Sequence, residues 1–107
     1  MELLRRDRRF TAGGVEIAHV ADVALEPDEQ VTFTTPAGGE LDVVRKDWGF
    51  YATSSLNRRL PDHGLRPVLV EGGDGRRWLL LVETGRERAF EAYRAEQGLE
   101  VVAWLDR

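Results

Sequence analysis

The chain has 107 residues, of which 42% are hydrophobic and 32% charged. This balance is typical of a folded globular domain and excludes a disordered chain. Nineteen acidic residues against fifteen basic ones give a formal net charge of −4, which argues against a protein built to bind nucleic-acid backbones. There is no cysteine, so disulfides, thiolate nucleophiles and cysteine-ligated metals are excluded. The length predicts a single domain over residues 1–107.

The first twelve residues are rich in arginine and contain no apolar run of the kind found in signal peptides. No stretch of the chain approaches the roughly 20 consecutive apolar residues of a membrane helix. We therefore expect a cytoplasmic protein without a membrane partner. Residues 1–12 themselves are predicted to form a flexible arm or an edge strand.

Alternation of apolar and polar residues predicts the first strands. From Val15 to Leu25 the apolar residues recur at every second position, as in a half-buried strand. Residues 31–35 are rich in β-branched side chains, and residues 41–45 follow after the turn sequence Pro36–Gly39. Together these two segments predict a hairpin.

The second half of the chain predicts another hairpin and one helix. Residues 67–71 and 78–82 flank the glycine-rich turn 72–75. Because residues 78–82 are apolar without alternation, they predict a central strand covered on both faces. Residues 84–97 predict a helix with a capping box from Thr84 to Glu87, and residues 99–105 predict a sixth strand.

These elements predict an α+β fold. We expect a mostly antiparallel, curved six-stranded sheet or partial barrel with one helix near the C-terminus. One helix cannot cover both faces of six strands, so we also expect a homodimer.

The segment from Asp47 to Leu65 has no clear strand or helix pattern and concentrates residue types that bind and react. Connections this long are often functional. Trp48, Phe50 and Tyr51 could form a stacking surface for a sugar or a base, and the alternative is that they pack in the core. The remaining candidates are polar ligand contacts, namely Asn57, Arg58 and Arg59.

Proton transfer in this segment would fall to Asp47 or His63 as the base, with Tyr51 as the acid or donor. Arg58 or Arg59 could hold an anion. Each residue also has a structural alternative: Asp47 as a turn cap, His63 as an exposed turn residue, the arginines as a solvated face, and Asn57 as a left-handed backbone position.

Residues 45–57, Arg-Lys-Asp-Trp-Gly-Phe-Tyr-Ala-Thr-Ser-Ser-Leu-Asn, resemble a signature of small uncharacterised bacterial proteins. These are encoded near surface-carbohydrate or specialised-metabolite genes, and the resemblance extends over residues 30–106. The pattern has proline where this chain has Ser54. The resemblance implies no particular activity, but it points to the same segment as the site.

His19 is a separate candidate because it falls on the apolar side of the first predicted strand. A hydrogen-bonded core histidine is the usual outcome, and a ligand contact on a concave sheet face is the alternative. With two histidines and no metal-ligand spacing, we expect no metal and no cofactor. The Ser54–Ser55 pair lacks the sequence setting of a catalytic nucleophile.

Three functions fit these features. We favour a small-molecule-binding or accessory protein of a bacterial biosynthetic pathway, which holds a polar, anionic metabolite with the 47–65 loop and the adjoining sheet face. The first alternative is a cofactor-independent isomerase, epimerase or lyase that uses Asp47 or His63 with Tyr51. The second is a protein-interaction module that acts on a partner enzyme.

Overall fold

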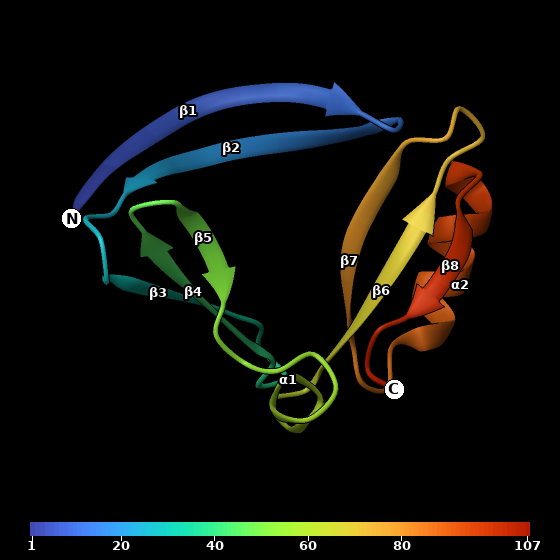
Figure 1. Ribbon diagram of the computed structural model, residues 1–107. Coiled ribbons are helices and arrows are strands. Elements are labelled where there is room, and N and C mark those ends of the chain that lie inside the picture. Colours follow the sequence, from blue (N-terminus) through green and yellow to red (C-terminus); the bar gives the residue numbers. More distant parts are fainter.

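A computed structural model describes residues 1–107 as eight strands and two helices (Figure 1). Every strand pair is antiparallel, which confirms a mostly antiparallel α+β fold. Neither helix is long and apolar enough to cross a membrane. The elements in chain order are β1 (Glu2–Ala12), β2 (Val15–Ala24), β3 (Gln30–Thr34), β4 (Glu40–Lys46), β5 (Gly49–Ala52), α1 (Arg59–Asp62), β6 (Leu65–Glu71), β7 (Arg77–Glu83), α2 (Glu87–Gln97) and β8 (Glu100–Trp104).

The strands form three open sheets, so the prediction of one six-stranded sheet is wrong. The sheets are β1–β2, β3–β4–β5 and β7–β6–β8. Hydrophobic alternation fixes which residues form strands but not which strands become neighbours, and the division into three sheets is set by tertiary contacts. The two predicted hairpins, now β3–β4 and β6–β7, are confirmed.

The long β1–β2 hairpin arches between the two three-stranded sheets (Figure 1). Its tip is a turn at Gly13 and Gly14, whose φ angles of 58° and 76° favour glycine. Residues 2–12 are therefore a paired strand. The predicted half-burial of residues 15–25 is wrong for most of the apolar positions, since Val15, Ile17 and Val23 remain exposed. No other layer of the same chain covers this hairpin along its length (Figure 1).

The C-terminal sheet contains the hydrophobic core. β6 is its central strand, bonded to β7 on one side and to β8 on the other, and α2 packs against it (Figure 1). Val68, Val70, Val82 and Phe90 form the buried cluster. The Phe90 ring meets the Trp104 ring edge to face, with centroids 5.6 Å apart. This is the part of the chain in which two layers of secondary structure enclose apolar side chains.

Two predictions for this region need correction. Residues 78–82 do not form a central strand, because β7 lies at the edge of its sheet with Leu79 53% exposed. Helix α2 begins at Glu87 and not at residue 84, and its N-terminus has no side-chain cap from Thr84. The Glu87 carboxylate instead accepts a hydrogen bond from the Gly85 N–H, while Gly98 ends the helix in the left-handed conformation with φ 69°.

Arg66 joins the elements of the C-terminal unit. Its Nε donates to Asp106 Oδ2 at 2.7 Å and its Nη1 to Glu87 Oε2 at 3.3 Å. The guanidinium also lies over the Trp104 ring, 4.2 Å from the centroid. One side chain on β6 therefore connects the N-terminus of α2 with the segment that follows β8. The hydrogen bond from Arg66 holds the pKa of Asp106 below its ordinary value.

The sign of this pKa shift predicts how stability depends on pH. A carboxyl whose folded pKa is lowered stabilises the fold above its unfolded pKa of about 4, and this contribution is lost as pH falls through the folded value. We expect Asp106→Asn to lower the free energy of unfolding at neutral pH by ~1–3 kcal/mol. We also expect it to flatten the loss of stability below about pH 4. Urea unfolding of both proteins across this pH range, at one protein concentration, measures both effects. An unchanged acid profile in the variant would contradict the assignment.

Candidate functional site

The predicted loop from Asp47 to Leu65 contains two regular elements, so its description as an irregular connection is wrong. Its first part is the turn of a tight hairpin, with Lys46 paired to Gly49 and only Asp47 and Trp48 between the strands. Gly49 has a φ of 149°, a conformation that favours glycine. The four residues of β5 are too few for alternation to show in the sequence. The second part is α1, a single helical turn.

Trp48 and Tyr51 form an exposed aromatic pair at this hairpin. Their ring centroids lie 6.3 Å apart and their planes differ by 25°. The Trp48 residue is 70% exposed and Tyr51 43% exposed, so the rings neither fill the core nor line an enclosed pocket. They instead form a stacked pair of nearly parallel rings that is exposed to solvent. We call this surface, formed by Trp48 and Tyr51, the aromatic platform.

β4 contributes two cationic side chains to this hairpin, Lys46 on the sheet face of Tyr51 and Arg45 on the opposite face with Phe50. The Lys46 ammonium pairs with Asp28, and the hydrogen bond from Lys46 to Asp28 raises the pKa of the lysine. Arg45 lies opposite Phe50 in the register, with its guanidinium 5.8 Å from the Phe50 ring centroid. One guanidinium nitrogen of Arg45, Nη1, is buried without a hydrogen-bond partner. The hairpin therefore combines three aromatic rings with two positive charges.

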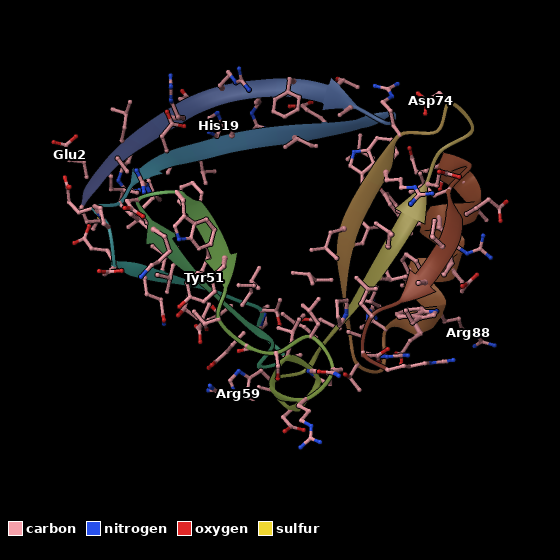
Figure 2. The ribbon with its side chains drawn as sticks, viewed as in Figure 1. Glu2, His19, Tyr51, Arg59, Asp74 and Arg88 are labelled. Atoms are coloured by element: carbon pink, nitrogen blue, oxygen red, sulfur yellow. The ribbon has the colours of Figure 1, made fainter.

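The other predicted site residues lie around α1. Arg58 and Arg59 are exposed at its start, and the Ser55 hydroxyl accepts a hydrogen bond from the Arg59 N–H. His63 follows the helix, with its Nδ1 buried and unpartnered. Asn57 is exposed in the preceding turn. In Figure 2, Arg59 points outward near α1, well away from Tyr51 on β5.

The length of β4 separates Asp47 from His63. The His63 carbonyl accepts a hydrogen bond from the N–H of Glu40, the first residue of β4, whereas Asp47 follows the last one. The seven residues of β4 span roughly 20 Å at about 3.3 Å per residue. The aromatic residues and Asp47 thus lie at one end of the strand, and His63, Arg58 and Arg59 lie near the other. One small ligand cannot contact both groups within a single chain.

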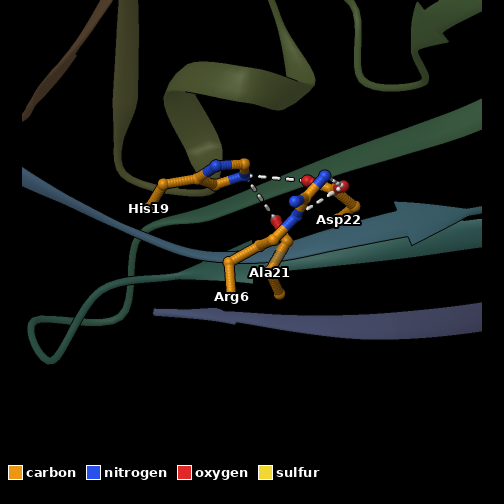
Figure 3. Close-up of polar contacts among 4 residues, drawn as sticks. All are labelled: Arg6, His19, Ala21 and Asp22. Atoms are coloured by element: carbon orange, nitrogen blue, oxygen red, sulfur yellow. Dashed lines mark hydrogen bonds and ion pairs between the residues drawn. The ribbon is translucent and has the colours of Figure 1, made fainter. Parts of the chain in front are cut away.

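His19 belongs to neither group. It lies on β2, where its Nε2 is 2.8 Å from Asp22 Oδ1 and 3.2 Å from the Ala21 carbonyl oxygen (Figure 3). Arg6 on β1 donates to the other oxygen of the same carboxylate. The hydrogen bond from Arg6 lowers the pKa of Asp22, and the neighbouring His19 lowers it further. The contact with Asp22 holds the His19 ring against its own hairpin.

The cavities of the structure lie elsewhere. One mostly apolar depression, of about 300 Å³, lies between the β1–β2 tip and the C-terminal unit. Trp78, Tyr93 and Gln97 are among its lining residues, which the sequence did not indicate as site residues. It contains no ionisable carboxylate, histidine or cationic side chain, so it offers no charge to an anionic ligand. No group of three or more histidine, aspartate or glutamate side chains converges on a common point.

Comparisons of the chain with models of protein families, with curated proteins and with solved structures gave no match. The resemblance of residues 45–57 to the bacterial signature therefore stays a prediction. At the position where that signature has proline, Ser54 is buried and its hydroxyl has no hydrogen-bond partner.

The exposure of Trp48 predicts its fluorescence. The chain has three tryptophans, and Trp48 is the most exposed of them. We expect Trp48→Phe to remove the most red-shifted emission and the largest share of acrylamide quenching, while Trp104→Phe removes the less quenchable emission. If Trp48→Phe leaves the quenchable fraction unchanged, the ring is covered in solution and the platform is not free.

Proposed function

We propose that the protein is an accessory protein that binds a polar sugar-like metabolite or saccharide on the aromatic platform. The single observation that carries this proposal is the exposed, nearly parallel pair of Trp48 and Tyr51. The apolar C–H face of a sugar ring stacks on aromatic rings, and two rings 6.3 Å apart can accept one extended ligand. Exposed aromatic rings suit a saccharide chain, whose binding requires no enclosed cavity.

The charges beside the platform support an anionic ligand such as a uronic acid derivative. Lys46 is held close to the platform by Asp28, and the ammonium has three donors, so it can bond a ligand carboxylate while it keeps Asp28. Arg58 and Arg59 cannot contact the same small ligand, because they lie near the far end of β4. In this proposal Lys46 replaces them as the anion contact.

The separation of the ionisable residues supports binding over catalysis. A general base must lie within hydrogen-bond reach of the proton that it removes. Asp47 shares its end of β4 with the platform but is exposed in the turn, where water solvates the carboxylate and competes with a substrate for it. His63 lies about 20 Å away along the strand. Around the aromatic rings an isomerase or lyase would have only Asp47 and Tyr51, both of which are exposed.

Substitution of the platform tests the proposal. We expect an acidic oligosaccharide of uronic acids to shift the Trp48 indole N–H resonance in a heteronuclear NMR titration. Trp48→Ala and Tyr51→Ala should each weaken binding by about tenfold, since each removes one stacking partner. Phe33→Ala is the matched control, because Phe33 is an exposed aromatic on the same sheet but outside the pair.

The results of this titration distinguish binding at the platform from binding elsewhere on the sheet and from no binding. Equal losses in Phe33→Ala and Trp48→Ala would mean that the sheet binds without use of the platform and would contradict the proposal. Lys46→Ala should weaken binding of the acidic oligosaccharide more than binding of a neutral one of the same length. No resonance shift with either oligosaccharide, in a protein shown to be folded, also contradicts it.

A protein-interaction module is the second candidate, and a different observation favours it. Only nine of the 107 residues are buried, while many large apolar side chains are exposed. Monomeric proteins rarely leave so much apolar surface without a partner. Binding of a saccharide at the platform and binding of a protein elsewhere are compatible, because the apolar surface extends over all three sheets.

A further inference from the structure

β7 is the strand whose place in the fold fits its sequence least. Residues Trp78–Val82 are apolar at every position, as in strands covered on both faces, yet β7 is an edge strand that pairs with β6 alone. Leu79 is 53% exposed and Trp78 43% exposed. Natural proteins protect exposed apolar edge strands because these pair readily with other chains. No other strand of the chain runs beside the free edge of β7 (Figure 1).

The register shows which backbone groups the free edge presents. Pro67 on β6 has no N–H, and its carbonyl accepts from Leu105, so Pro67 makes no backbone bond to Leu81 opposite it. Backbone groups alternate in direction along an antiparallel strand. The N–H groups at four positions of β7 therefore point away from β6: Arg77, Leu79, Leu81 and Glu83. Those of Leu80 and Val82 point toward β6.

We propose that β7 pairs with β7 of a second copy of this chain, antiparallel about a two-fold axis at Leu80. In this register Arg77 lies opposite Glu83 of the second copy at both ends of the pair, and Leu79 lies opposite Leu81. The outward N–H groups then bond across the interface. Three strands from each copy form one continuous sheet, and both α2 helices lie on the same face of it.

The charges of β7 are complementary to themselves in this register. Glu83 Oε1 is buried and has no hydrogen-bond partner within one chain. Arg77 already pairs with Glu71 at 2.9 Å through Nε, but its guanidinium carries further donors. Opposite residues of a hydrogen-bonded pair are ~5.5 Å apart at Cα, which is within reach of an arginine side chain. The second copy thus supplies a partner for a carboxylate oxygen that lacks one.

The β1–β2 hairpin gives the second copy more apolar surface to cover. It arches beside the sheet edge that β7 forms, and its tip approaches the C-terminal unit through the hydrogen bond from Gln97 to the Gly13 carbonyl (Figure 1). Its exposed apolar side chains include Leu3, Leu4, Phe10 and Val20. Edge pairing buries backbone and side chains of β7, and it brings a second molecule near this uncovered hairpin.

Charge reversal tests the register. The wild-type protein is expected at twice 12.1 kDa in light scattering coupled to gel filtration. Arg77→Glu places two glutamates opposite each other at each end of the strand pair, and Glu83→Arg places two arginines there. Two copies of the same variant therefore repel each other, and each variant shifts to the monomer mass. An equal mixture of the two is complementary at both ends and returns to the dimer mass. Arg76→Glu, in the turn just before β7, is the matched control and keeps the wild-type mass.

Amide exchange gives a second readout that does not depend on any variant. In the dimer the Leu79 and Leu81 amides exchange slowly with deuterium, like the Leu80 and Val82 amides that point toward β6. A monomeric wild-type protein at NMR concentration, or fast exchange at Leu79 and Leu81 beside slow exchange at Leu80 and Val82, overturns the proposal. Dimeric Arg77→Glu and Glu83→Arg proteins overturn the register.

Discussion

The structure depends on β6, the strand that is hydrogen-bonded on both edges and packed against a helix. Four of the nine buried residues lie on it: Leu65, Pro67, Val68 and Val70. Its Arg66 side chain connects α2 and the segment after β8, and the residues just before it bond to the start of β4 and so join two sheets. Gly64, at a φ of 83°, lies beside Gly39, and a Cβ at Gly64 would be 3.5 Å from the Gly39 Cα. Every other strand except β4 has a free edge.

The position of β4 decides how the site is divided. The strand starts at the contact with His63 and ends at the aromatic hairpin. It therefore places the aromatic platform and Asp47 at one end, and the residues around α1 at the other. Residues that are close in the sequence can contact the same ligand only when the chain between them is compact. Here an extended strand and a short turn carry them apart. This arrangement leaves Asp47 near the platform of Trp48 and Tyr51 and separates both from His63.

The small buried core connects the two proposals. The chain has enough apolar residues for an ordinary core, but one copy leaves much of that apolar surface exposed on β1, β2 and β7. Burial of apolar area is the main favourable contribution to folding, so covering this surface stabilises the folded chain. Pairing through β7 assigns this role to a second copy and leaves the β4–β5 hairpin, on a different sheet, for a ligand.

The sequence by itself determined the local elements. Alternation and turn residues predicted β2, β3, β4, β6, β7 and β8, the main helix and its Gly98 cap, because these depend on neighbours in the chain. It also indicated the aromatic residues of the candidate site. Only the tertiary structure decided that β5 exists, that Asp47 and His63 are far apart, and that β7 is an edge strand. The apolar pattern of β7 reports that both its faces avoid water, whereas the number of strands beside it depends on contacts between distant segments, or between copies, that no local pattern encodes.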